Sequence, residues 1–257
     1  MVIQGRKRFA LLLAAQDSDY VKKVYGGYYN VFVETLGDEG DKWDTFRVVE
    51  GDFPSMDDLE KYDGFVISGS PHDAHGHEDW VLELCILLQT LFDMQKKVLG
   101  ICFGHQILCR ALGGKVARSC SGWDIGVRRV KFIEDFHFSI FLSTDYDQRI
   151  IPPTLSIIEC HQDEVWEVPS GARVLAHSEK TGVEMFTFGE NILGIQGHPE
   201  YNKDILNNLI DRLHSNNSID IVFVENAKLQ LMEAEPDTES WQRICKGFLK
   251  RDMIHIW

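Results

Sequence analysis

The chain has 257 residues, of which 44% are hydrophobic and 26% charged, so it is long enough to bury a sizeable core. Its formal net charge of −14 argues against nucleic acid or an anionic membrane as a general partner, although the local field of an active site can still be positive. The six cysteines are scattered without a C-x-x-C pair, which is typical of a reducing compartment, and we expect a cytosolic protein.

The first half of the chain alternates predicted strands and helices. Residues 6–15 also resemble the start of a short signal peptide, but seven apolar residues followed by a polar segment favour a buried first strand. No apolar run reaches the length of a membrane span. We expect strands at 8–15, 45–49, 65–67 and 97–99, and helices at 18–36 (interrupted at 26–27), 80–96 and 105–112.

The second half has a different texture, with short strands that follow one another. We expect strands at 127–132, 156–160, 174–177, 183–188 and 192–195, a helix at 203–214 and a helical tail from about 217 to 257. Residues 189–191 indicate a hairpin. The order of elements predicts a single α/β domain over 1–257, a flavodoxin-like doubly wound, mostly parallel sheet with a small antiparallel subsheet.

Residues 100–104, Gly-Ile-Cys-Phe-Gly, lie between a predicted strand and a predicted helix. A G-x-nucleophile-x-G sequence in this position is typical of a nucleophile elbow, which is best known with serine at its centre. The glycines permit a tight turn that lifts the central side chain above the sheet. The N-terminus of the following helix favours thiolate over thiol. The pattern predicts that Cys102 is a nucleophile.

A cysteine nucleophile needs a base and a group that orients the base. Residues 194–200, Gly-Ile-Gln-Gly-His-Pro-Glu, predict a buried strand that runs into a histidine and a carboxylate two positions apart. Residues i and i+2 of an extended chain point to the same side, and Pro199 biases His198 towards extended backbone. The spacing indicates His198 as base and Glu200 as its orienting group, with a His-Pro turn and a solvated glutamate as the alternative.

Acyl transfer also needs donors for the developing oxyanion. The backbone N–H of Phe103 follows the nucleophile directly, and the turn at 68–71, Ser-Gly-Ser-Pro, ends a neighbouring strand at the sheet edge where ligands bind. An ordinary strand-ending turn is the alternative interpretation of 68–71.

The four motifs Ser-Gly-Ser-Pro, Gly-Ile-Cys-Phe-Gly-His-Gln, His-Gln-Asp-Glu-Val at 161–165 and Gly-Ile-Gln-Gly-His-Pro-Glu occur in the order seen in class I glutamine amidotransferases, which this sequence resembles. The resemblance implies a triad and an oxyanion hole at the positions already indicated, with Ser70 and Phe103 as the two N–H donors. It also implies a pocket for the glutamyl head of the substrate, formed by Gly69, Gln106, His161 and Asp163.

Within that family the sequence looks most like plant γ-glutamyl peptidases, with further matching stretches at 25–28, 61–70 and 198–203. That likeness implies hydrolysis of small-molecule γ-glutamyl substrates such as glutathione conjugates in sulfur-containing defence-metabolite (glucosinolate) pathways, without a cofactor. Pro71 and His72 depart from the pattern beside the pocket, which affects the expected fine specificity.

Two other functions stay open from the sequence: a glutaminase subunit that delivers ammonia to a separate synthase, and a binding protein without catalysis. The stretch 72–79 is rich in His, Asp and Glu, but without a second ligand cluster we interpret it as a solvated loop and expect no metal. Nothing in the sequence indicates an oligomeric state.

Overall fold

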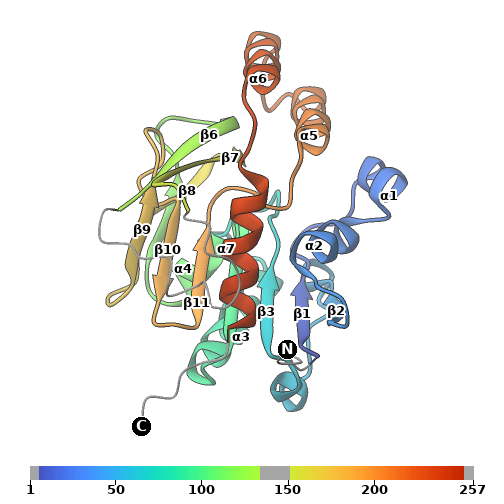
Figure 1. The fold of residues 1–257 in the computed structure, drawn as a ribbon, viewed down its shortest axis with the longest axis vertical. Coiled ribbons are helices and arrows are strands. Elements are labelled where there is room, and N and C mark those ends of the chain that lie inside the picture. Colours follow the sequence, from blue (N-terminus) through green and yellow to red (C-terminus); the bar gives the residue numbers. More distant parts are fainter. Residues whose placement is uncertain (1–5, 134–150, 252–257) are drawn as a thin grey trace.

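The computed structural model describes residues 6–133 and 151–251, and its centre is a sheet in the strand order β2-β1-β3-β4-β11-β10-β9-β6-β7 (Figure 1). The first part of this sheet is parallel. The inner parallel strands are buried on both faces, which explains why they are short, mostly apolar runs, whereas the edge strand β2 is partly exposed. These strands are β1 (Arg8–Leu12), β2 (Lys42–Phe46), β3 (Gly64–Ile67), β4 (Lys97–Ile101) and β11 (Ile192–Ile195).

The rest of the sheet is antiparallel, and a separate small sheet pairs β5 with β8. The predicted hairpin is confirmed, because β10 and β11 pair with Phe188 opposite Ile192. The predicted fold class, with its large sheet and small antiparallel sheet, is confirmed as well. The antiparallel strands are β6 (Asp124–Phe132), β7 (Thr154–His161), β9 (Arg173–His177), β10 (Met185–Phe188), β5 (Lys115–Arg118) and β8 (Asp163–Glu167).

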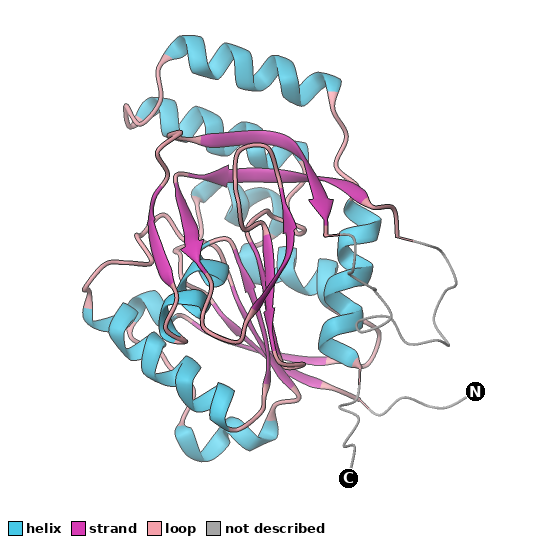
Figure 2. Ribbon diagram, turned by 90° about the vertical axis from the view of Figure 1, so that its left-hand side faces the viewer, coloured by secondary structure: helices cyan, strands magenta, loops and turns pink. Residues whose placement is uncertain are grey.

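Helices cover both faces of the large sheet (Figures 1 and 2). Alternate residues of β1 show the two layers, since Phe9 and Leu11 pack with α2 (Tyr28–Leu36) and α7 (Thr238–Lys250), whereas Ala10 and Leu12 pack with α3 (Asp79–Asp93) and α4 (Phe103–Ala111). The helices α5 (Lys203–Ser215) and α6 (Ile221–Glu233) form a third cluster with β6 and β7. No helix of the described residues is long and apolar enough to cross a bilayer.

The predicted interruption of the helix at 18–36 is confirmed, since α1 (Asp19–Tyr25) and α2 are separated by Gly26 and Gly27, which take φ of 76° and 112°. Some strand bounds differ from the prediction. The strand expected at 8–15 ends at Leu12. The strand expected at 45–49 lies at Lys42–Phe46, where it pairs with β1. The following residues form two 3₁₀ turns, η1 (Val48–Glu50) and η2 (Met56–Lys61). The predicted tail is helical over α6 and α7, and its residues 252–257 lie outside the described part.

Candidate active site

Cys102 lies in the turn between β4 and α4, and its backbone is strained. It has φ 52° and ψ −104°, a combination that residues with a side chain rarely adopt. Its N–H donates to the carbonyl oxygen of Ile195 over 2.9 Å, which ties the turn to β11. Helix α4 begins at Phe103, so the partially positive N-terminus of the helix lies beside the sulfur.

The glycines on either side of this turn are required by close packing. A Cβ on Gly104 would lie 2.5 Å from the carbonyl oxygen of Ile67, and one on Gly100 would lie 2.3 Å from the carbonyl oxygen of Gly104. Any side chain there would push α4 away from β3 and β4. Neither glycine has positive φ, so the left-handed strain falls on Cys102 alone within this turn.

His198 and Glu200 form a buried pair, with His198 Nδ1 2.8 Å from Glu200 Oε1. The sequence predicts that this pair ends an extended strand, but β11 stops at Ile195 and the chain turns. His198 is instead held by an isolated bridge to β7, in which its N–H donates to the Ile158 carbonyl over 2.8 Å. The Tyr201 ring stacks on the imidazole, with centroids 4.0 Å apart and an interplanar angle of 2°.

The thiol and the imidazole meet at Gly69. A Cβ built there would lie 3.6 Å from Cys102 Cβ, 2.9 Å from His198 Cε1 and 3.7 Å from His198 Nε2. The structure therefore brings together residues that are almost a hundred positions apart in the sequence. Both side chains are nearly buried, at 5% and 4% exposure, so their interaction is little screened by water.

The two groups shift each other's ionisation. Burial raises the pKa of the Cys102 thiol, and the interaction with His198 opposes this effect. Burial alone would lower the pKa of His198, but Glu200 and Cys102 outweigh it and raise that pKa to about 10. The shifts belong to one pair that shares a proton, and Glu200 favours its location on the imidazole.

Replacing Gly69 with alanine is expected to reduce any activity of this centre by about 10- to 100-fold, because the new methyl group displaces an imidazole held between Glu200 and Tyr201. Gly182→Ala is the matched control, since its Cβ would have no neighbour within 4 Å. Steady-state rates and thermal unfolding of both variants check this expectation. Equal rates for the two variants would contradict it.

The two expected oxyanion donors lie at adjacent strand ends. Among hydrogen bonds to described residues, neither the Ser70 N–H nor the Phe103 N–H has an acceptor. The turn that carries Ser70 is fixed by its hydroxyl, which donates to the Ala14 carbonyl over 2.6 Å and accepts from the N–H of His72 over 3.1 Å. Both amides are therefore available to a ligand.

Gln106 and His161 converge on the backbone carbonyl of Asp163. Gln106 Nε2 donates to this oxygen over 2.8 Å, and His161 Nδ1 lies 2.9 Å from it. Burial lowers the pKa of His161 to about 4, so the ring is neutral near pH 7. Since a carbonyl only accepts, the proton of the neutral ring is on Nδ1. These contacts fix the β7–β8 turn beside the centre.

A cleft of about 430 Å³ opens over the thiol. This volume lies in the range of small-molecule sites. One wall comes from the turn at 68–71, Gln106, and the β7–β8 turn with Asp163. Another wall comes from α2 and α5. Gly69, Gln106, His161 and Asp163, which the resemblance implies in substrate binding, all line this cleft.

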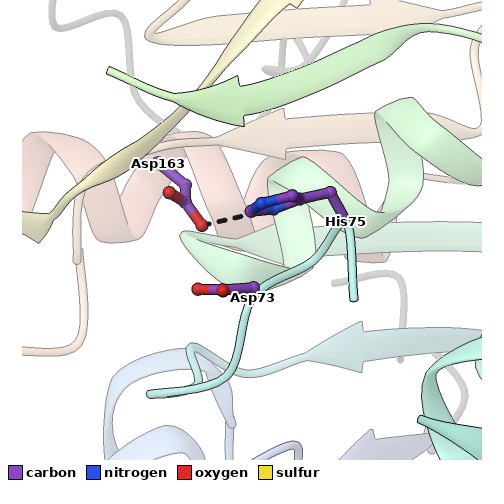
Figure 3. Close-up of side chains that lie close together, drawn as sticks. All are labelled: Asp73, His75 and Asp163. Atoms are coloured by element: carbon purple, nitrogen blue, oxygen red, sulfur yellow. Dashed lines mark ion pairs between the residues drawn. The ribbon is translucent and has the colours of Figure 1, made fainter. Parts of the chain in front are cut away.

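A charged cluster forms part of the cleft wall. Asp73, His75 and Asp163 place one ligand atom each within 4.8 Å of one another, and His75 Nδ1 is 3.5 Å from Asp163 Oδ2 (Figure 3). The Arg118 guanidinium, however, binds Asp163 at 2.8 Å and Asp73 at 3.0 Å. It pairs with both carboxylates, so we interpret the cluster as an ion-pair network and assign no metal to it.

Buried carboxyl groups support the β7 side of the centre. Glu159, Glu184 and Asp124 are at most 1% exposed, and Glu159 Oε2 lies 3.5 Å from His161 Nε2. Burial and the nearby Glu184 raise the pKa of Glu159 well above its usual value. Burial raises the pKa of Glu184 to about 7, with a further contribution from Asp124. A protonated Glu159 can donate to the free Nε2 of the neutral His161.

Glu184→Gln is expected to flatten the dependence of stability on pH. The folded state retains a proton up to about pH 7 that the unfolded chain releases near 4.5, so wild-type stability falls as pH rises between these values. The variant lacks this loss, and we expect it to be more stable at pH 8 by roughly 3 kcal/mol, with little gain at pH 4.5.

Urea unfolding from pH 4.5 to 8 measures this difference, with exposed Glu190→Gln as control. A constant difference between Glu184→Gln and wild type across the pH range would contradict the proposed ionisation.

The sequence did not indicate several groups around the centre. Tyr201 follows the His-Pro-Glu motif directly, so its position was the one available signal. Arg118 lies on β5, a strand that the sequence analysis does not predict. Arg212 lies on α5 and reaches the cleft because this helix packs against β7. Glu159 lies within the predicted strand at 156–160, where nothing in the local sequence indicates that it is buried.

Comparison with known proteins defines the class. Residues 24–211, more than half of the chain, match the family model for class I glutamine amidotransferases. A crystal structure of a glutamine amidotransferase from Thermotoga maritima has a TM-score of 0.70 at 21% identity, covering 95% of this chain and 97% of that one, and so has the same fold. The chain belongs to the class I glutamine amidotransferase family.

Closer relatives are similar over nearly the whole chain. γ-Glutamyl peptidase 5 of Arabidopsis thaliana is 53% identical over 97% of this chain and 98% of its own length. γ-Glutamyl peptidase 2 of the same plant is 50% identical over 99% of this chain and its full length. One subunit of a glutamine-hydrolysing GMP synthase from Sulfolobus acidocaldarius is 31% identical over 57% of this chain and 71% of its own length.

Proposed function

We propose that this protein is a γ-glutamyl peptidase, which hydrolyses the γ-glutamyl amide bond of glutathione conjugates through a thioester on Cys102. The convergence of a strained, buried thiol with a carboxylate-oriented imidazole at Gly69 carries the proposal. The similarity to γ-glutamyl peptidases along nearly the entire chain supports the choice of substrate class. A reducing cytosol fits this assignment, since it keeps the nucleophile as a free thiol.

In the first half-reaction the Cys102 thiolate attacks the γ-carbonyl carbon and forms a C–S bond. The carbonyl electron pair moves to oxygen, where the N–H groups of Ser70 and Phe103 stabilise it. When this intermediate collapses, the C–N bond breaks. His198 gives its proton to the leaving nitrogen, and Glu200 holds the ring in the required orientation.

In the second half-reaction water attacks the γ-glutamyl thioester. His198 accepts a proton from the water, the C–S bond breaks and the thiolate is regenerated with free glutamate as product. The imidazole therefore acts once as acid and once as base. Its raised pKa suits the first role, because the protonated ring is available near neutral pH.

A glutaminase that supplies ammonia to a synthase is the second candidate, and the similarity to the GMP synthase subunit favours it. That similarity covers 57% of this chain, against 97% for γ-glutamyl peptidase 5. The two functions share their chemistry up to the thioester and differ in the leaving group, which is ammonia in one case and the amine of a peptide in the other.

Parallel incubation with glutamine, glutathione and an S-substituted glutathione tests the proposal. We expect glutamate and the corresponding cysteinylglycine in equal amounts, with a higher kcat/KM for the conjugate than for glutamine. Preferential release of ammonia from glutamine would favour the glutaminase, and no release of glutamate from any substrate would contradict both candidates.

A further inference from the structure

Arg212 on α5 is a cation in the cleft without a carboxylate partner among the residues that the structure describes. It lines the cleft together with its helix neighbours Leu209 and Leu213, and its side chain is exposed. Among residues 6–133 and 151–251, no side chain forms a hydrogen bond or an ion pair with its guanidinium. The adjacent Asp211 is engaged by Lys228 at 2.6 Å instead.

The charge of Arg212 reaches the catalytic neighbourhood. It acts on the Tyr28 hydroxyl, lowering a tyrosine pKa that burial raises, and on the Cys160 thiol. The ring of Tyr28 lies 6.4 Å from the ring of Tyr201, which stacks on the imidazole of His198. The carbonyl oxygen of Cys160 is 4.0 Å from the sulfur of Cys102. Arg212 and Cys102 line the same cleft, so a ligand bound at the thiol shares the cleft with this cation.

The other arginine that lines the cleft, Arg118, is surrounded by carboxylates. Arg118 is paired with Asp163 and Asp73, so this part of the cleft offers a cation and anions together. Such a combination matches the zwitterionic end of a γ-glutamyl group, which carries one carboxylate and one ammonium. Arg212 has no carboxylate paired with it among the described residues; the cleft residues near it in the sequence are apolar (Leu209, Leu213) or uncharged and polar (Asn216, Ser218). This combination matches a lone carboxylate on an otherwise uncharged group.

We propose that Arg212 binds the terminal carboxylate of the leaving peptide and so selects γ-glutamyl peptides over glutamine. This inference rests on the proposed function and adds the group that distinguishes its substrates. A protein with a net charge of −14 repels anionic substrates at long range. An arginine in the cleft offsets this repulsion for a substrate carboxylate that is bound there. A guanidinium is suited to the task because it binds a carboxylate through two parallel hydrogen bonds.

The test compares an S-substituted glutathione with its C-terminal amide, which lacks the carboxylate but keeps every other group. For wild type we expect kcat/KM to be about 10- to 100-fold higher for the acid. Arg212→Gln should reduce this acid-to-amide ratio to near one, and Arg212→Lys should restore part of it. Arg173→Gln, which removes an exposed arginine on β9 outside the cleft, should keep the wild-type ratio.

The outcomes of this comparison distinguish the role of Arg212 from the proposed function. A ratio that stays high in Arg212→Gln would overturn the inference. An equal loss on acid, amide and glutamine would overturn it too, because Arg212 would then bind the γ-glutamyl end. Failure of wild type to release glutamate from both peptides would contradict the proposed function itself. Thermal unfolding of each variant separates loss of binding from loss of fold.

Discussion

Replacement of Cys102 with alanine is expected to lower γ-glutamyl hydrolysis by a factor on the order of 10⁵ while the protein stays folded. No other group that we place at the centre can form the acyl intermediate, so only binding and the oxyanion donors remain. Alanine tolerates the φ of 52° no worse than cysteine does, and the residue is small. We therefore expect little change in thermal unfolding. Glutamate release from an S-substituted glutathione measures the effect.

Covalent labelling gives a second readout of the same prediction. A glutamine-like chloroketone should alkylate wild type at Cys102 in a single event that blocks activity, and peptide mass mapping should locate the label. Cys120 is exposed and distant from the elbow in sequence, so Cys120→Ser is the matched control and should label as wild type does. Substantial turnover by Cys102→Ala, or labelling that persists in it, would refute the assignment.

The local part of this site could be predicted from the sequence because its signals are local. The elbow at 100–104 is one contiguous stretch between a strand and a helix, and Gly100 is required by an atom of the same stretch, the carbonyl oxygen of Gly104. Gly104 is required by the Ile67 carbonyl oxygen of the neighbouring strand β3, but the glycine pattern itself is visible in the local sequence. The hairpin at 189–191 and the apolar runs of the parallel strands are local as well. Each follows from short-range backbone preferences and periodicity.

The remainder depends on tertiary packing that periodicity does not encode. Lys42–Phe46 has half-exposed residues and little apolar patterning, and it becomes a strand because β1 offers it an edge. The small β5–β8 sheet brings Arg118 to Asp163 across more than forty positions. Arg212 enters the cleft only because α5 packs on β7. Such residues become candidates once the cleft is known.

His198→Ala is expected to lower the rate on the order of 10⁴-fold, because the imidazole must both give a proton to the leaving amine and take one from water. The effect should fall mainly on kcat, since the ring contributes less to ground-state binding. His177→Ala, which removes an exposed histidine on β9, is the control. If loss of His198 raised KM with kcat unchanged, the imidazole would be a binding group and the triad would be wrong.

The dependence of rate on pH then separates proton transfer from simple packing. In wild type, Glu200 helps to raise the pKa of His198 to about 10, so the protonated ring persists well into the alkaline range. Glu200→Gln keeps the shape of the side chain but removes its charge, so the imidazole pKa falls below its wild-type value, with burial opposed only by the interaction with Cys102. The alkaline limb of the kcat profile should therefore move to lower pH, in addition to a loss of about 10²-fold at neutral pH. A carboxylate that only fills space would reduce the rate and leave the position of that limb unchanged, so the profile decides whether Glu200 acts through the charge of its partner.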